Sequence, residues 1–358
     1  MKVFLQKRTD ISAVNNIRAV LISVALALVV FSFVLLASGA DPLSAYMDIV
    51  TAAFGSVRGL SNTGIKMIPF LLCGLAFLVP RKAGLWNIGG VGQLHMGAVL
   101  SAWVAYSFSN LPAPLLISLM LIAAFIGGGV LGGICGFLKA KWSANEVVTT
   151  MMFNYVAILL VNHLSAYPWR RGGGIAYPMT SELVPAAWMP VIAGTRIHYT
   201  IVIGIVAAII IFYWLRKTKT GYEIRTVGSN PQAAKYSGIS SMKIILLTMF
   251  IGGGLAGLAG FGEVAGLQHS LRVNDFTPPD ARYGFSGLIV AYLAGMNSLV
   301  LIVSSFLFGG IITGGNTLQI IANLSSGITG LFQGLVLIFV IGGQVLLRYK
   351  IKIKTGEP

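Results

Sequence analysis

Residues 113–137 read Ala-Pro-Leu-Leu-Ile-Ser-Leu-Met-Leu-Ile-Ala-Ala-Phe-Ile-Gly-Gly-Gly-Val-Leu-Gly-Gly-Ile-Cys-Gly-Phe. None of these 25 side chains is charged, and a helix needs only about 20 apolar residues to cross a bilayer. The stretch therefore predicts a transmembrane helix. Similar runs recur on both sides of it, so the same reasoning extends outward to the whole chain.

The composition of the chain agrees with a membrane protein. Of its 358 residues, 56% are hydrophobic and 10% are charged, whereas a soluble domain has about 25% charged residues. An ordinary soluble enzyme is therefore excluded. The two cysteines, Cys73 and Cys135, both lie in apolar stretches and build neither a disulfide framework nor a zinc site.

The apolar runs predict an all-α, polytopic fold with about ten transmembrane helices. The first run, Ala19–Ala37, follows a basic start and resembles a signal peptide loosely, but it is longer than the usual hydrophobic region, and we expect an uncleaved helix. The other nine expected spans are Ile65–Val79, Gln93–Phe108, Ala113–Phe137, Val147–Leu164, Thr200–Leu215, Ile244–Gly262, Tyr283–Ala294, Leu299–Ile312 and Ile328–Leu347.

The positive charges predict how these spans are oriented. The net charge of +15 would suggest nucleic-acid binding in a soluble protein, but in a membrane protein Lys and Arg gather in the cytoplasmic loops. With both termini cytoplasmic, 18 of the 25 basic residues fall on the cytoplasmic side. The seven left outside are Arg58, Lys66, Arg170, Arg171, Arg196, Arg272 and Arg282. This split supports the orientation and argues against a nucleic-acid partner.

Three stretches rich in glycine and polar residues are expected to interrupt the spans. They are 84–93, which contains Trp86, Asn87 and Gln93, then 252–266, and 309–316. Lipid cannot hydrogen-bond an open backbone, so a broken helix at membrane depth must face protein or a water-filled path. The alternative is that the glycines only allow close helix packing. We favour a translocation path for 84–93 and leave both interpretations open for 252–266.

The chain carries no motif for ATP hydrolysis or for other catalysis. It contains no Gly-Lys dipeptide and therefore no Walker A loop. Two glycine patterns like a dinucleotide fingerprint, beginning at Gly127 and Gly252, lie inside apolar spans and are interpreted as packing glycines. Only Glu146 and Glu263 lie near membrane depth, and Glu146 also suits a helix N-terminus. A transporter built this way is expected to take its energy from a partner.

The cytoplasmic loop at about 216–243 is expected to contain one short helix. Asn230 is a good N-cap, Pro231 fits the first helical position, and Gly238 can end the helix. Ala233 and Ala234 would allow another surface to approach closely. A solvated helix at the lipid headgroups is the alternative.

This loop carries a family resemblance. Gly221-Tyr222-Glu223-Ile224-Arg225-Thr226-Val227-Gly228-Ser229-Asn230-Pro231, with Ala233-Ala234 and Gly238-Ile239, resembles the coupling segment of bacterial ATP-binding-cassette (ABC) importer permeases for simple sugars, branched-chain amino acids and nucleosides. The 84–93 stretch, with Asn145-Glu146 and Asn154-Tyr155, is similar to further motifs of that family. The closest resemblance is to the nucleoside, or basic-membrane-lipoprotein-linked, subgroup. Gly295-Met296-Asn297 departs from the more usual Gly-Arg/Lys-Asn.

The resemblance implies a single permease domain over residues 1–358, with an external loop at about 165–199, in the bacterial inner membrane. It implies a second permease, identical or paralogous, two cytoplasmic ATP-binding subunits and an extracytoplasmic binding protein or lipoprotein. ATP would be used by those partners, and no cofactor or metal is expected on this chain. The expected substrate-pathway residues are Trp86, Asn87, Gln93, Asn145, Glu146, Asn154 and Tyr155. The expected coupling residues are Gly221, Glu223, Arg225, Asn230, Pro231, Ala233, Ala234 and Gly238.

Two other classes compete with this interpretation. An autonomous secondary transporter or channel would move its solute without ATP, and a membrane enzyme would need a catalytic constellation that the sequence does not offer. The aromatic and amide side chains of the pathway set suit a nucleoside or a simple sugar. The alternative role for each of them is to satisfy the backbone of a broken helix.

Overall fold

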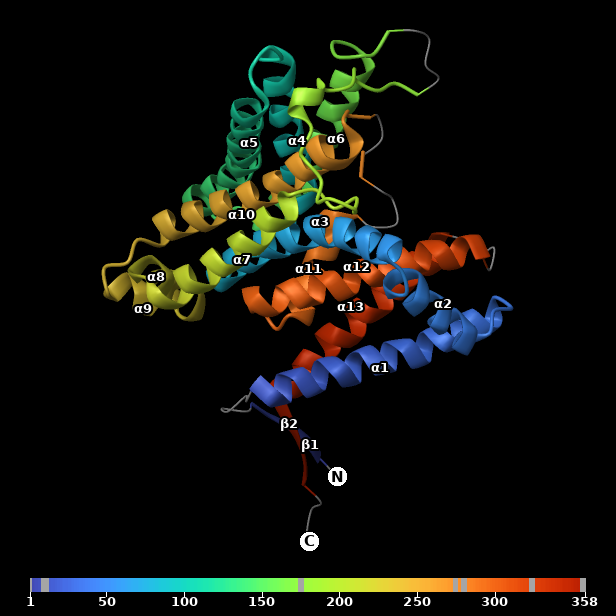
Figure 1. The fold of residues 1–358 in the computed structure, drawn as a ribbon. Coiled ribbons are helices and arrows are strands. Elements are labelled where there is room, and N and C mark those ends of the chain that lie inside the picture. The colour runs from blue at the N-terminus through green and yellow to red at the C-terminus, as the bar shows by residue number, and fades with distance from the viewer. Residues whose placement is uncertain are drawn as a thin grey trace. The chain divides into compact units, whose positions relative to one another are not determined.

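The computed structural model describes residues 2–7, 13–172, 177–272, 276–277, 282–321 and 326–354, most of which are helical (Figure 1). The first elements are β1 Lys2–Lys7, α1 Ala13–Ala37, α2 Pro42–Phe54, α3 Val57–Lys82, α4 Gly90–Ser107, α5 Ala113–Trp142, α6 Glu146–Ala166 and the 3₁₀ helix η1 Pro185–Ala187. The remaining elements are α7 Thr200–Lys217, α8 Lys219–Ser229, α9 Pro231–Tyr236, α10 Ser241–Glu263, the π-helix η2 Val264–Gln268, α11 Tyr283–Leu293, α12 Ser298–Ile321, α13 Ser326–Arg348 and β2 Tyr349–Lys354.

The all-α membrane class is confirmed, and a helix covers most or all of every expected apolar run. Among the described residues, six helical segments are long and apolar enough to cross a membrane: α3, α5, α6, α7, α10 with η2, and α12. A seventh is obtained if Leu21–Ala37 and Pro42–Phe54, bent by 113° at their break, form one span. The count of ten is not confirmed, since α11 and the apolar part of α13 are shorter helices and α4 is not among the six.

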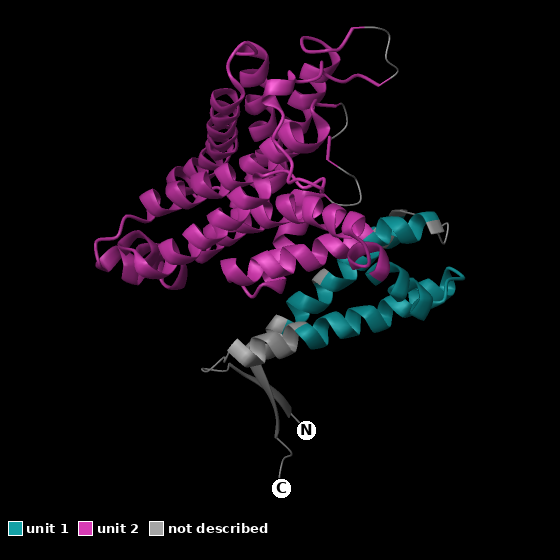
Figure 2. Ribbon diagram, in the orientation of Figure 1, with its two compact units in different colours: residues 1–50, 314–358 teal, residues 51–313 magenta. Residues whose placement is uncertain are grey.

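The chain forms two compact units (Figure 2), of which unit 1 holds residues 1–50 and 314–358. Here α1 packs against α13, with the rings of Phe31 and Phe332 4.6 Å apart. The Tyr46 hydroxyl donates to the Leu28 carbonyl at 2.7 Å, which ties α2 to α1. The backbones of β1 and β2 pair as an antiparallel ladder, an element that the sequence analysis does not anticipate. The single-domain organisation expected from the sequence stays a prediction.

Unit 2, residues 51–313, is built around α3. This helix is almost wholly buried, because α10, α11 and α7 pack along it. By contrast, α6 and α7 expose most of their apolar side chains. In a bilayer an exposed apolar face belongs against lipid, so α6 and α7 form the periphery of the unit and α3 its core.

Glycines bring α5 and α10 into backbone contact. A Cβ on Gly128 would lie 2.2 Å from the Gly253 carbonyl oxygen, and one on Gly257 would lie 2.1 Å from the Ala124 oxygen. Small residues at such crossings let membrane helices pack through dispersion forces. Both fingerprint-like glycine patterns are therefore packing patterns, and the part of the 252–266 stretch up to Glu263 is continuous helix rather than a break.

The expected interruption at 309–316 is wrong, because α12 runs without a break from Ser298 to Ile321. Two glycines here accommodate neighbours instead. A Cβ on Gly309 would lie 2.8 Å from the Thr63 carbonyl oxygen, and one on Gly310 would collide with the Phe54 ring. In the sequence, a glycine pair used for packing looks the same as one used for a break, because the difference lies in the neighbouring helix.

Candidate functional site: a polar break and a pair of surface helices

The expected break at 84–93 is observed between α3 and α4, and we call residues 83–93 the polar break. Helix α3 ends at Lys82, and Gly84 then adopts a φ of +84°, a left-handed conformation that favours glycine. The following helix begins at Gly90. The chain thus leaves helical geometry for several residues beside the most buried helix of the unit, where its backbone polar groups need partners from protein.

Two buried amides supply part of that need. Asn87 Nδ2 donates to Gln93 Oε1 at 2.9 Å, and Gln93 Nε2 donates back to Asn87 Oδ1 at 2.8 Å. Asn87 also donates to the Ala76 carbonyl of α3 at 3.2 Å and accepts from the Gly89 N–H at 3.2 Å. The pair therefore locks the start of α4 to the break and to α3.

Helix α6 supplies further hydrogen-bond partners for the backbone of the break. Asn154 Oδ1 accepts from the Gly92 N–H at 2.7 Å, and Asn154 Nδ2 donates to the Ile88 carbonyl at 3.1 Å. The Ile88 N–H donates to the Thr150 hydroxyl at 3.3 Å. The sequence analysis missed Thr150, although its place one turn before Asn154 puts it on the same helix face. Asn87 and Asn154 thus bond the backbone of the break, and Gln93 bonds the Asn87 amide.

Within the described part of the chain, Asn145, Glu146 and Tyr155 do not join these amides, although Glu146 accepts from the Trp86 backbone N–H of the break. Asn145 caps α6 by accepting from the Val147 N–H at 3.0 Å, and Glu146 pairs with Lys139 at the end of α5 at 2.8 Å. Both residues thus act at a helix junction. Tyr155 is 60% exposed, and among the described residues no hydrogen bond joins it to the amides. The translocation role of these residues stays a prediction.

Trp86 belongs to an aromatic group beside the break. Its ring centroid lies 5.8 Å from that of Phe77 and 6.2 Å from that of Tyr292, and the Arg81 guanidinium lies 4.6 Å from its centre. A cation over an indole face is stabilising, and the ring stays half-buried. Trp86 therefore links the break, of which it is part, to α3 and α11.

The expected coupling segment contains two helices rather than one. Beyond the predicted short helix, residues 219–229 form α8, capped by the Thr218 hydroxyl, which accepts from the Gly221 N–H at 3.1 Å. Gly221 and the side chains of Ile224 and Val227 are buried. Their helical spacing turns one face of α8 toward the rest of unit 2. This amphipathic pattern is present in the sequence, but the sequence analysis did not predict this helix.

The second helix, α9, is built as the sequence predicts. Asn230 Oδ1 accepts from the N–H groups of Gln232 at 3.1 Å and Ala233 at 3.0 Å, Pro231 stands at the first helical position, and Gly238 follows the helix with a φ of +74°. Ala233 is exposed, whereas Ala234 is fully buried within this chain. Ala234 is therefore not available to a partner surface, contrary to the expectation.

The pair α8–α9 presents two tyrosines that the sequence analysis did not select. Tyr236 at the end of α9 is 93% exposed, and Tyr222 on α8 is 59% exposed. Glu223 is half-buried and Arg225 is exposed. Aromatic side chains are enriched in protein–protein interfaces, which makes these two tyrosines candidates for contact with a partner.

Helix α8 touches the polar break directly. A Cβ on Gly228 would lie 2.1 Å from the Lys82 carbonyl oxygen and 3.0 Å from the Gly84 nitrogen. The backbones of α8 and of the end of α3 are therefore in direct contact, with no room for a side chain between them. This contact joins the surface helices to the end of α3 and to the first residues of the break.

His198, in the loop at about 165–199, is buried near the half-buried His269, which directly follows η2. His198 packs against Gly266, and His269 stacks on Trp188 with ring centroids 4.2 Å apart. Burial, with a smaller contribution from the nearby His269, lowers the pKa of His198 to about 4. The imidazole is therefore neutral at physiological pH.

Comparison with known proteins places the chain among membrane permeases. Residues 59–341 match the family described as branched-chain amino acid transport system, permease component. The chain is 32% identical to a glucose ABC transporter permease protein of Haloferax volcanii, over 93% of this chain and 89% of the relative. It is 33% identical to a nucleoside ABC transporter permease protein of Lactococcus lactis (84% and 85%) and 29% identical to a guanosine ABC transporter permease protein of Bacillus subtilis (96% and 98%).

Proposed function

This chain belongs to the family of branched-chain amino acid transport system permease components, and on that premise we propose that it moves a nucleoside or a simple sugar. It is the multi-pass membrane permease of an ABC importer and has no ATPase motif of its own. Such a permease works with ATP-binding subunits and a substrate-binding protein. The proposed solute class is supported by the names of the three relatives, two of which carry nucleosides and one glucose.

We further propose a transporter with two permeases, identical or paralogous, and two ATPases. Within its described residues the chain carries one α8–α9 pair, so two chains are needed to engage a pair of ATPases. The basic residues favour a bacterial inner-membrane orientation with both termini and α8–α9 in the cytoplasm. The mass of the detergent-solubilised complex measures the stoichiometry, and a complex with one permease would contradict it.

The contact of Gly228 with the end of α3 carries the proposed mechanism. Binding and hydrolysis of ATP by the partners would move α9 and, through it, α8. Because the α8 backbone rests on Lys82 and Gly84, its displacement is passed to the polar break without a flexible side chain between them. The coupling roles of Glu223, Arg225, Asn230, Pro231 and Ala233 are part of this proposal.

Uptake into proteoliposomes that hold the permease with its partners tests the function. We expect uptake of labelled guanosine or glucose that requires ATP, and competition among solutes separates the two classes. The cap variant Asn230→Ala removes the acceptor for two N–H groups and weakens α9 by about 1 kcal/mol. It should lower uptake per ATP, whereas the neighbouring Ser229→Ala should not. Uptake driven by an ion gradient without ATP would instead indicate a secondary transporter.

A further inference from the structure

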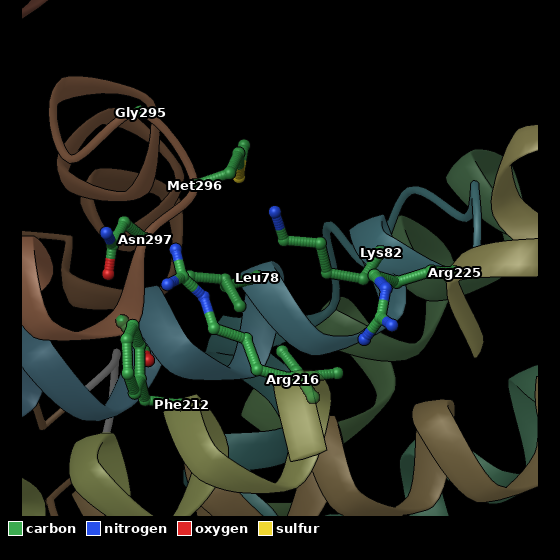
Figure 3. Close-up of a pocket in the computed structure, with 10 residues that line it drawn as sticks. Leu78, Lys82, Phe212, Arg216, Arg225, Gly295, Met296 and Asn297 are labelled. Carbon is green, nitrogen blue, oxygen red and sulfur yellow. The ribbon is translucent and has the colours of Figure 1, made fainter. Parts of the chain in front are cut away.

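A cavity of about 380 Å³ opens in unit 2 on the side of the surface helices (Figure 3). It lies between the end of α3, the end of α7, the middle of α8 and the turn from α11 to α12. Its volume falls within the range of ligand-binding pockets, about 300–1,000 Å³. Of the residues proposed for ATPase coupling only Arg225 lines it, and none of the proposed translocation-path residues does.

Three cations line this cavity: Lys82 from α3, Arg216 from α7 and Arg225 from α8. The lining contains no Asp or Glu, and among the described residues no ion pair is recorded for any of the three. Like charges that line one cavity repel one another, and an anion bound in the cavity would offset that repulsion.

The rest of the lining is mainly apolar. Leu78 and Leu215 are buried in the wall, and Phe212 lies under the Arg216 guanidinium, whose Cζ is 4.3 Å from the ring centre. The cation–π contact holds the guanidinium at the rim of the apolar surface. Figure 3 shows Lys82 and Arg216 extending toward the turn that carries Met296. The cavity thus offers positive charge and hydrocarbon surface side by side.

We propose that this cavity binds the phosphate headgroup of an anionic phospholipid, with the start of its acyl chains against the apolar wall. The cavity lies at the ends of the spans α3 and α7, the depth at which the headgroups of one leaflet stand. In the proposed orientation this is the cytoplasmic leaflet, where basic pockets between helices hold anionic headgroups. A soluble phosphate would use the three cations but has no need of the wall formed by Leu78, Leu215 and Phe212.

Lipid binding to the purified full-length permease tests this site. The chain is reconstituted in nanodiscs of phosphatidylcholine with increasing phosphatidylglycerol, and bound lipid is counted by native mass spectrometry while thermal stability is followed in parallel. Each cation removed from the cavity should lower the affinity for phosphatidylglycerol about 5-fold, since one Lys or Arg contributes about 1 kcal/mol near an anionic surface. The pair Lys82→Gln with Arg216→Gln should lower it about 25-fold.

The matched control removes two neighbouring charges outside the cavity. Lys217 and Lys219 are exposed and do not line it, so Lys217→Gln with Lys219→Gln changes the net charge equally. The control pair should keep the bound lipid. The charge-conserving pair Lys82→Arg with Arg216→Lys should keep it as well, and this result would show that the loss in the Gln pair is not a folding defect. Equal loss in the cavity pair and the control pair would overturn the site. Stabilisation by inorganic phosphate alone, with no added effect of phosphatidylglycerol, would overturn the lipid assignment.

Discussion

Replacing Gly228 by alanine should separate ATP hydrolysis from transport. An alanine Cβ would stand 2.1 Å from the Lys82 carbonyl oxygen, whereas ordinary van der Waals contact begins near 3.4 Å. The atoms in the way are backbone atoms of Lys82, Ala83 and Gly84, which cannot rotate aside. Helix α8 must therefore move away from α3 by about 1 Å, and overpacking of this kind costs about 1–3 kcal/mol.

The variant is informative because it does not weaken α8 itself. Alanine has a higher helix propensity than glycine by about 1 kcal/mol, so the helix is stabilised while its contact with the break is lost. If that contact transmits the motion, a penalty of 1–3 kcal/mol on the coupling step reduces uptake per ATP hydrolysed by about 5- to 150-fold. ATP hydrolysis by the assembled complex should continue.

The assay measures solute uptake and ATP hydrolysis in the same proteoliposomes. The matched control is Ser229→Ala, the next residue on α8, which is exposed and whose hydroxyl bonds only the Thr226 carbonyl of its own helix. Equal membrane levels and a cooperative thermal transition in both variants show that both have folded. A Gly228→Ala transporter with the wild-type ratio of uptake to hydrolysis would refute transmission through this contact.

Three further predictions concern the rest of unit 2. Asn87→Ala leaves a buried partner amide and a backbone N–H unpaired, so it should cost about 1–3 kcal/mol in thermal unfolding and lower uptake without releasing the ATPases. Gly257→Ala should destabilise the chain, because its Cβ would lie 2.1 Å from a backbone oxygen, whereas Gly133→Ala meets its nearest atom at 3.6 Å and should be neutral. The pKa of His198, lowered to about 4 by burial and by His269, means that the unfolded chain binds a proton near pH 6.5 that the folded chain binds only near pH 4. Stability should therefore fall by up to about 3 kcal/mol as the pH drops from 6.5 to 4, and thermal unfolding of His198→Gln should show a smaller dependence.

The parts of the fold that the sequence predicted are those fixed by local chemistry. Apolar runs of sufficient length became helices, and the ends of α9 follow from Asn230, Pro231 and Gly238, because caps depend on residues within one helical turn. Each of these features is determined by neighbours along the chain, so a single sequence suffices to find it.

The role of each glycine was not determined by neighbours along the chain. Gly84 turns the backbone at a helix end, whereas Gly257 sits in a straight helix against Ala124, although both lie in glycine-rich apolar surroundings. Likewise, Gly221 and Gly228 have a low helix propensity, but each is required where α8 crosses another backbone. Tertiary contact overrides helix propensity at such positions.

The basic cavity was beyond sequence analysis for a related reason. Lys82 comes from α3, far along the chain from Arg216 and Arg225 on α7 and α8. The sequence analysis counted all three as markers of the cytoplasmic face and gave only Arg225 a further role, in coupling. A positive-inside bias explains why a Lys or Arg occurs near a span, but it does not say which of them converge. Only the packing of α8 on α3 and α7 brings the three together.

The hydrogen bonds of the polar break determine when its amides are available to bind a solute. The amides of Asn87 and Gln93 bond each other, and that of Asn154 bonds the backbone of the break. In this arrangement they hold the break and do not offer a free set of partners to a solute hydroxyl. A solute that binds these amides must first displace those bonds, each worth about 1 kcal/mol. Because Gly228 rests on the first residues of the same break, a movement of α8 shifts the backbone to which the amides are bonded. Solute affinity at the break and the state of the ATPases should therefore be linked, each changing the other by the same factor.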